Sequence, residues 1–326
     1  MAVLGIVVVD YKSTGRTIRY VREELYKIKT PHRVVVVNNG GTPMSDAELA
    51  EGTGGQLLYS VQDQPDLKRE VFILESQENL GYAKGNNLGV DFLRKHFAVK
   101  YYLFSNNDLE LPYGDICELL IAKMECDTKI GCIGPKIVSR KGRYQSPQRF
   151  LTVWQRVIWS KLFYPFLLPF GQLWSEVIQD APEGYYYRLA GCFLLIRAEA
   201  FEVVGGFDTG TFLYAEEQIL AERMKRHGYC MYYTTEARVI HHHGMTTSQF
   251  LTSRANSTAM LESLFHYYRT YIGLSRLEAR MFRFSATVYS HLYQPVLSII
   301  SLILHKCMNF MQKNKLVKRI ESQNHP

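Results

Sequence analysis

The chain has 326 residues, of which 47% are hydrophobic and 21% are charged. This composition is typical of a folded α/β protein with a large core in one or two domains, and it excludes a largely disordered chain. The net charge of +7 favours an anionic partner, such as a nucleotide diphosphate, an acidic lipid surface or a nucleic acid, without choosing among them.

The six cysteines form no CxxC pair and show no regular spacing. The N-terminus lacks the charged start, apolar core and cleavage site of a secretory signal. These features predict free thiols in a reducing, cytoplasmic compartment and argue against a structural zinc site.

The first third of the chain alternates between strand and helix patterns. Strand-like runs rich in β-branched and aromatic residues span residues 3–11, 33–37, 71–74 and 101–104. Helical patterns follow the first run through Leu25 and the third run at about residues 85–96. This alternation predicts an α/β fold with a doubly wound, mostly parallel sheet flanked by helices.

Polar residues follow three of these strands. They are Asp10, the pair Asn38 and Asn39, and residues 106–108. In an open parallel sheet the ligand lies beyond the carboxyl ends of the strands, so these side chains are expected to line one crevice. Any one cluster is equally explained by turns and helix caps, but three in succession favour a binding site.

Residues 151–178 are crowded with aromatic and apolar side chains between scattered basic residues and prolines. Their apolar stretches are shorter than the roughly 20 residues that a spanning helix needs. Two interpretations stay open: an interfacial or acceptor-facing element, and an aromatic insertion that packs into the core.

The segment 251–326 is predicted to be helical after about Leu261, and it ends in a basic tail. Polar residues and Pro295 interrupt its apolar run. An amphipathic helix on a membrane surface therefore fits better than a transmembrane span, and a plain packing helix is the alternative.

Two acidic positions are candidates for chemistry. Asp108 follows the fourth strand, where a carboxylate can hold Mg²⁺ or Mn²⁺ against a diphosphate, since hard cations prefer oxygen ligands. Glu216 and Glu217 begin a helical pattern. They either stabilise the helix N-terminus or provide a general base that deprotonates an acceptor hydroxyl.

Three histidines, His241, His242 and His243, follow a strand-like run and precede Gly244. Alternation along a strand directs one or two of them toward the crevice, where an imidazole can complete a metal shell or contact a diphosphate. Residues 79–89 (NLGYAKGNNLG) also follow a strand, but their glycine spacing fits neither a P-loop nor a dinucleotide fingerprint.

Five segments together carry a family resemblance: residues 79–89, 105–108, 191–197, 205–217 and 241–243. Their order and spacing resemble the family-2 inverting glycosyltransferases of the GT-A fold, in particular the bacterial rhamnosyltransferase-like members that build surface polysaccharides. The resemblance covers roughly residues 3–250.

The resemblance implies roles for individual residues. Asp108 corresponds to the metal-binding acid of a DXD-type motif, and His241 to a metal or diphosphate histidine, with a shift to His242 left open. Glu217 corresponds to the general base, with Glu216 beside it. Arg223 matches a family arginine whose role is not assigned. The nucleotide-sugar-binding set is Asp10, Tyr11, Asn38, Asn79, Gly81, Lys84, Asn86, Asn106 and Asn107.

Three positions depart from the family pattern. Asp10 replaces a frequent asparagine, Asn38 replaces the aspartate that commonly recognises the base, and Glu217 replaces an aspartate. The longer base shifts the attacking hydroxyl by about one methylene, which matters because errors near 1 Å are costly in catalysis.

The resemblance implies a GT-A domain over residues 1–250 and a helical, basic extension over residues 251–326. The expected activity is metal-dependent, inverting transfer of a sugar from a nucleotide-diphosphate donor to a glycan or lipid-linked acceptor. The expected location is peripheral, at the cytoplasmic face of the inner membrane, with no nucleic-acid partner.

Two rival functions differ in class from this one. A catalytically silent, membrane-associated sugar-binding or scaffold subunit is suggested by the asparagines that replace aspartates and by the basic C-terminus. A sugar nucleotidyltransferase shares the broad fold, but residues 10–16 are a poor version of the glycine- and lysine-rich loop that such enzymes carry after the first strand.

Overall fold

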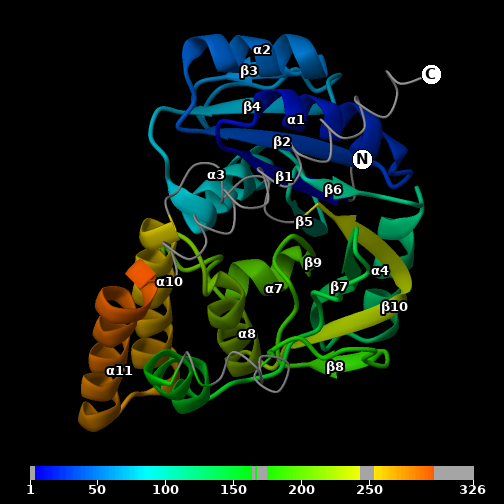
Figure 1. The fold of residues 1–326 in the computed structure, drawn as a ribbon. Coiled ribbons are helices and arrows are strands. Elements are labelled where there is room, and N and C mark those ends of the chain that lie inside the picture. The colour runs from blue at the N-terminus through cyan, green and yellow to red at the C-terminus, as the bar shows by residue number, and fades with distance from the viewer. Residues whose placement is uncertain (1–3, 164–165, 167–174, 243–252, 297–326) are drawn as a thin grey trace, which may run out of the picture.

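The computed structural model describes residues 4–163, 166, 175–242 and 253–296 (Figure 1). These residues build a ten-stranded sheet in the order β3-β4-β2-β1-β5-β9-β7-β10-β6, with β8 paired to β10. The strands are β1 (Leu4–Asp10), β2 (His32–Asn39), β3 (Gln56–Leu58), β4 (Val71–Ser76), β5 (Tyr101–Ser105), β6 (Leu109–Glu110), β7 (Ile130–Ser139), β8 (Gly184–Tyr186), β9 (Phe193–Arg197) and β10 (Cys230–His241).

The first five strands are all parallel, as the sequence predicts. β1 lies between β2 and β5, and Asp10 is opposite Asn38 in the register of β1 and β2. β4 extends this half on the other side of β2. The carboxyl ends of β1, β2 and β5 therefore meet at one edge, where the polar clusters were expected.

The second half of the sheet is mixed. β9 lies antiparallel between β5 and β7, and β10 runs parallel to β7. The short β6 pairs antiparallel with the end of β10, so that His241 is opposite Leu109. This pairing brings the C-terminal end of β10 next to Asp108.

Helices cover both faces of the sheet. They are α1 (Thr14–Arg19), η1 (Tyr20–Glu24), η2 (Leu25–Lys27), α2 (Pro43–Thr53), α3 (Gly81–His96), α4 (Ile116–Cys126), η3 (Trp154–Trp159), α5 (Ser160–Leu162), α7 (Ala198–Val203), α8 (Glu216–Arg226), α10 (Ser253–Tyr267), η5 (Tyr268–Ile272), α11 (Arg276–Val288) and η6 (Tyr289–Tyr293). Alternate side chains of β1 face opposite layers. Ile6 packs in a cluster with α2 and α4, whereas Val7 packs in one with α3, α7 and α8.

The C-terminal helices are packed against the rest of the molecule. Figure 1 shows α10 next to α8 and α11 on the far side of α10, and these elements share a third hydrophobic cluster with η3. Val157 of η3, Ile219 of α8 and Leu264 of α10 are all buried in it. The described part of the extension therefore has a buried face on the core. The domain boundary at residue 250 stays a prediction.

The aromatic insertion contributes to the same cluster. Val157 and Ile158 are buried, and the indole Nε1 of Trp154 donates to Glu278 Oε1 on α11 at 3.1 Å. Residues 164–165 and 167–174 of this insertion lie outside the described residues. Within the described ranges, no helix has both the length and the apolar character needed to cross a bilayer.

Candidate active site

Asp10 lies at the centre of a buried polar network at the end of β1. Its Oδ1 accepts hydrogen bonds from Ser13 Oγ at 2.5 Å and Thr17 Oγ1 at 2.6 Å. The Nδ2 of Asn107, which follows β5, donates to the same oxygen at 3.3 Å and to Thr17 Oγ1 at 2.6 Å. The structure thus joins two predicted donor-binding residues. The second oxygen of Asp10 is buried and has no partner among the described residues.

Asn38, at the end of β2, is bound to helix α2. Its Nδ2 donates to Asp46 Oδ1 at 2.6 Å and to Ser45 Oγ at 2.9 Å. Burial raises the pKa of Asp46 and the hydrogen bond from Asn38 opposes that rise. Sequence reasoning missed Asp46, since no strand end or motif marks it. It places a buried carboxyl beside the position where the family resemblance expects one.

The loop at the start of α3 connects the sheet edge to a distant segment. Asn79 Oδ1 accepts from the Gly81 amide at 3.0 Å and from Asn39 Nδ2 at 3.0 Å. Gly81 has a φ of +75°, and a Cβ there would lie 2.2 Å from the carbonyl oxygen of Phe212. Only glycine fits both restrictions, and the adjacent Tyr82 amide donates to the Phe212 carbonyl at 3.0 Å, so the NLGY motif packs directly against Phe212.

The other predicted donor-binding residues around this loop differ in exposure. Asn86 is buried and its Nδ2 donates to the Tyr82 carbonyl at 2.9 Å, within its own helix. Lys84 is exposed and Tyr11 is half-buried at the crevice. The backbone amide of Asn106 donates a hydrogen bond to the Cys192 carbonyl at 2.9 Å. Their assignment to donor binding stays a prediction.

Asp108 and His241 lie side by side, although 133 positions separate them. The distance from His241 Nε2 to Asp108 Oδ1 is 3.1 Å, and both residues are buried. The other ring nitrogen, Nδ1, lies 2.6 Å from Gln145 Oε1 and donates to it. This arrangement directs Nε2 at the carboxylate, as in metal-ligating histidines that donate their second N–H to an oxygen.

The charge of His241 depends on its neighbours. Burial alone lowers the pKa of the imidazole, but the nearby Cys192 and Asp108 side chains outweigh it and raise the pKa to about 10. His242 points elsewhere, with Nε2 3.4 Å from Glu110 Oε2. The structure therefore brings the imidazole of His241, rather than that of His242, to the Asp108 carboxylate, while the His242 backbone amide donates to the Asp108 carbonyl at 2.9 Å. His243 lies outside the described residues.

Asp108 and His241 suit a divalent cation that is shared with a ligand. A carboxylate oxygen and an imidazole nitrogen are donors that Mn²⁺ and Mg²⁺ accept. In the part of the chain that the structure describes, no group of three or more histidine, cysteine or acidic side chains is placed to hold a metal. A cation at this pair would therefore take its other ligands from water or from the oxygens of a bound diphosphate.

Glu217 is positioned by an unusual backbone turn. Tyr214 and Ala215 both have positive φ, at +74° and +69°, directly before α8. Such non-glycine residues cost free energy and cluster at functional sites. The turn directs Glu217 toward the amide of Gly191, which donates to Oε1 at 3.1 Å, and toward Arg188, whose Nη1 lies 3.9 Å from Oε2.

Glu216 has a different environment from Glu217. It is 3% exposed, and its Oε1 has no partner among the described residues. Burial and the neighbouring Glu217 carboxylate raise the pKa of Glu216 to about 8. Glu217, in contrast, is in contact with a guanidinium and lines a pocket. Of the two predicted catalytic carboxyls, Glu217 lines the pocket and Glu216 does not, and the catalytic role of either stays a prediction.

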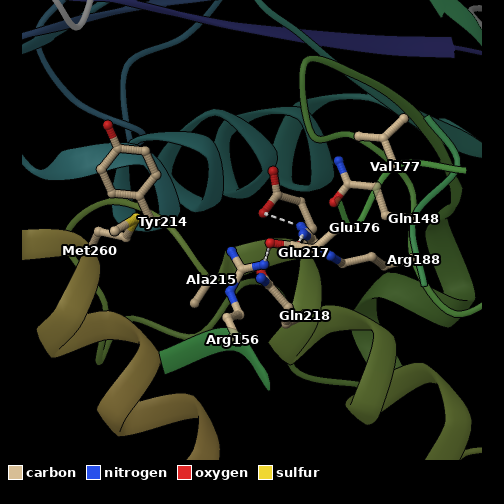
Figure 2. Close-up of a pocket in the computed structure, with 10 residues that line it drawn as sticks. All are labelled: Gln148, Arg156, Glu176, Val177, Arg188, Tyr214, Ala215, Glu217, Gln218 and Met260. Carbon is tan, nitrogen blue, oxygen red and sulfur yellow. Dashed lines mark hydrogen bonds and ion pairs between the residues drawn. The ribbon is translucent and has the colours of Figure 1, made fainter. Parts of the chain in front are cut away.

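The pocket beside Glu217 has a volume of about 280 Å³ (Figure 2). It is lined by Gln148, Arg156, Glu176, Val177, Arg188, Tyr214, Ala215, Glu217, Gln218 and Met260. Glu176 forms ion pairs with both arginines. Sequence reasoning singled out only Glu217 and the surrounding turn, because the other charged groups come from three separated segments without a recognisable motif.

Comparisons with known proteins agree with the sugar-transfer function that the sequence predicts. No protein-family model matches the chain. It is 25% identical over 256 residues to an N-acetylglucosaminyl-diphospho-decaprenol L-rhamnosyltransferase of Mycobacterium tuberculosis, a match that covers 76% of this chain and 78% of the relative. It is also 25% identical to the low-salt glycan biosynthesis hexosyltransferase Agl10 of Haloferax volcanii, over 68% of this chain and 62% of the relative.

Two solved structures share the fold at 12% sequence identity and a TM-score of 0.53. One is the mannosyltransferase PcManGT from Pyrobaculum calidifontis in complex with GDP-Man and Mn²⁺, matched over 94% of this chain and 80% of that one. The other is GalNAc-T7 with UDP, GalNAc and Mn²⁺, matched over 91% and 57%. The chain is a glycosyltransferase with the GT-A fold.

In this glycosyltransferase, Arg223 of α8 binds the loop that contains Gly206 and Asp208 and precedes Glu217. Its guanidinium donates to the Gly206 carbonyl at 3.1 Å and lies 3.7 Å from Asp208 Oδ2. That same Asp208 oxygen accepts from His266 Nε2 at 2.8 Å and from the Tyr271 hydroxyl at 2.7 Å. Arg223, to which the resemblance gives no role, thus belongs to a hydrogen-bonded group that connects α8 with the C-terminal helices.

Proposed function

We propose that this glycosyltransferase moves a sugar from a nucleotide-diphosphate donor to a hydroxyl of a lipid-linked glycan, with inversion at the anomeric carbon. The observation that carries the proposal is the position of Glu217. Its carboxylate lines a pocket and accepts a hydrogen bond from the Gly191 amide, while the side chain of the next residue, Cys192, interacts with His241, the neighbour of Asp108. In the proposed single displacement, the base and the leaving diphosphate lie on opposite faces of the transferred sugar.

The donor side of the site is the crevice at the ends of β1, β2 and β5. We assign the nucleotide to the surroundings of Asp10 and Asn38, where Asp46 adds a buried carboxyl. Asp108 and His241 would hold a divalent cation next to the diphosphate. When bound, such a cation neutralises the charge that develops on the departing diphosphate. The Mn²⁺ in both similar solved structures supports this assignment.

On the acceptor side, Glu217 takes the proton from the attacking hydroxyl. The Gly191 amide fixes one carboxylate oxygen and Arg188 attracts the other, so the base is oriented before the acceptor arrives. Attack from the pocket side, opposite the leaving diphosphate, inverts the anomeric centre. The buried Glu216 supports the turn from behind and is not itself among the residues that line the pocket.

The acceptor is proposed to be presented at a membrane surface. The similar rhamnosyltransferase is named for a decaprenol-linked acceptor. Exposed apolar side chains lie on neighbouring elements, at Trp159 and Phe163 and, on α11, at Leu277 and Phe284. Basic residues of α11 accompany them. We propose that this region faces the cytoplasmic leaflet, with residues 251–326 as the extension and residues 1–250 as the catalytic domain.

The experiment that tests this function is a donor screen with the purified protein. Release of nucleotide diphosphate is measured across a panel of nucleotide sugars, with lipid-linked acceptors and with Mg²⁺, Mn²⁺ or chelator. The expected result is metal-dependent consumption of one donor, loss in Asp108→Ala and Glu217→Gln, and a product of inverted anomeric configuration by NMR. Nucleotide binding without turnover under all these conditions would instead favour a silent sugar-binding subunit.

A further inference from the structure

Two arginines in the pocket share one acidic partner. Arg156 comes from η3 and Arg188 from the segment before Gly191, and both form ion pairs with Glu176. Arg188 is 7% exposed. Figure 2 shows the two guanidinium groups meeting the Glu176 carboxylate, with Glu217 beside them. The cluster lies in the pocket that Glu217 also lines. In the proposed transfer step only Arg188 has a role, which is to orient Glu217.

If Glu176 left the cluster, two guanidinium groups would share one carboxylate, that of Glu217, so the position of Glu176 suits an anion. Burial and, to a smaller extent, the neighbouring Arg188 together lower the pKa of Arg156 to about 10, so Arg156 remains cationic at neutral pH. Burial also lowers the pKa of Arg188, and the nearby Glu217 opposes that shift. Two buried guanidinium groups held together are costly unless strong acceptors satisfy them, and the planar guanidinium matches phosphate oxygens in a bidentate way.

Several polar atoms around the cluster also lack partners. Within the described residues, Arg156 Nε, Gln148 Oε1 and Gln218 Oε1 are buried and make no hydrogen bond. All three residues line the same pocket. Buried polar groups are normally satisfied, so this concentration indicates a polar ligand or ordered water at the position.

Glu176 is the most accessible member of the cluster. Its side chain is 22% exposed, compared with 8% for the side chain of Arg188. Its backbone is fixed, because the Arg149 amide donates to its carbonyl at 2.9 Å. The carboxylate can therefore turn toward solvent and leave the arginines in place without unfolding the segment.

We infer that Arg156 and Arg188 bind the pyrophosphate of a prenyl-diphospho-sugar acceptor, and that Glu176 occupies the pair until the acceptor arrives. This inference rests on the proposed function. Arg188 contacts both Glu217 and Glu176, so the anion position lies beside the base, across one guanidinium group. The acceptor sugar would then lie between the bound pyrophosphate and Glu217, with its attacking hydroxyl toward the Glu217 carboxylate.

The donor diphosphate is a different anion at a different position. We assign it to Asp108 and His241, which are not among the residues that line the pocket. Inhibition of the wild-type enzyme distinguishes binding of pyrophosphate at the acceptor position from binding at the donor position. A short-chain prenyl diphosphate without sugar is expected to inhibit competitively against the prenyl-diphospho-sugar and not against the donor. Competition against the donor alone would overturn the inference.

Variants then test the arginines directly. Rates are compared for a short-chain prenyl-diphospho-N-acetylglucosamine and for an octyl glycoside of the same sugar. Arg156→Gln is expected to lower the preference for the diphosphate acceptor, as the ratio of the two kcat/KM values, by about tenfold to a hundredfold. Arg156→Lys keeps the charge and is expected to recover part of it. The exposed Arg22, which does not line the pocket, gives the matched control Arg22→Gln, with an unchanged ratio.

Glu176→Gln distinguishes recognition from a purely structural ion pair. Removal of the competing carboxylate is expected to lower the KM for the diphosphate acceptor by about threefold or more, since the arginines are then free. A structural role predicts the opposite, a loss with both acceptors in proportion to a lower Tm. If the wild type consumes no donor with either acceptor, the proposed function itself fails. If it uses both and the ratio is the same in all variants, only this inference fails.

Discussion

The backbone amide of Gly191 donates a hydrogen bond to Oε1 of Glu217 at 3.1 Å. The carbonyl of the same glycine accepts from the Tyr82 hydroxyl at 2.8 Å, and the next carbonyl, of Cys192, accepts from the Asn106 amide. The proposed base is therefore held by the same short segment that borders the proposed metal pair. Its position depends on backbone atoms rather than on flexible side chains.

Replacement of the base tests the division of roles between the two glutamates. Glu217→Gln keeps the acceptor oxygen for Gly191 but cannot take a proton, so kcat should fall by about 10²- to 10⁴-fold. Glu216→Gln should lose far less, because a carboxyl whose pKa is raised to about 8 is already mostly protonated at neutral pH and the amide mimics it. Initial rates measure both. Equal losses would mean that the roles are assigned wrongly.

Gly191→Ala should misplace the base without unfolding the protein. A Cβ at this position would lie 2.3 Å from Glu217 Oε1, so the carboxylate has to move. A shift near 1 Å is expected to cost about a hundredfold in kcat. Adding Glu217→Asp shortens the side chain and should recover part of the rate. Gly15→Ala is the matched control, because the added Cβ would have no neighbouring atom within 4 Å. Additive losses in the double variant would contradict this account.

Asp108→Asn should weaken activation by the cation. The neutral amide retains an oxygen ligand but loses the charge, so the concentration of Mn²⁺ or Mg²⁺ needed for half-maximal activity should rise by about tenfold or more. Glu110→Gln is the control, since Glu110 lies beside His242 rather than His241. Metal titration of initial rates gives the comparison, and an unchanged midpoint in Asp108→Asn would remove Asp108 from the cation site.

The buried Glu216 should make stability fall with rising pH. Its pKa is raised from 4.5 to about 8 in the folded state, so the unfolded chain releases its proton at lower pH than the folded one. This contribution to stability is fully present below pH 4.5 and is lost as the pH rises through about 8. Urea unfolding of Glu216→Gln from pH 5 to 8 should therefore show a smaller decline than the wild type. Parallel curves would show that Glu216 ionises normally.

Asp208→Asn should loosen the C-terminal helices. Asp208 accepts from His266 and Tyr271 and lies beside Arg223, and these hydrogen bonds together with the Gly210 amide hold its pKa below the ordinary range despite burial. Loss of the charge is expected to cost about 1–3 kcal/mol of unfolding free energy at neutral pH. The exposed Asp91, paired with Arg94 in α3, provides the control Asp91→Asn, which should change it by less than about 0.5 kcal/mol.

The parallel half of the fold could be predicted because its strands are buried on both faces and appear as continuous apolar runs. The same patterns placed Asp10, Asn38 and Asn107 at one edge. The mixed half could not be predicted in this way, because β9 enters between β5 and β7 from a position later in the chain. Local pattern carries no information about such an insertion.

The site was predictable where motifs exist and not where it depends on tertiary packing. Asp108 and His241 were expected to converge, and the structure brings them together. The arginines of the pocket carry no motif, and Asp46 follows no strand. The NLGY motif was noticed but not explained, since its function is to bind the Phe212 carbonyl across more than one hundred residues.

The packing of α10 against α8 means that the extension covers the helix that carries the proposed base, Glu217. Leu264 and Tyr268 are buried in one cluster with Ile219, two positions after Glu217. Shortening the chain at residue 250 is therefore not expected to yield a smaller working enzyme, because it would expose the apolar face of α8. It follows that exchange of this segment between related enzymes, in order to alter the acceptor, has to carry α8 along with it.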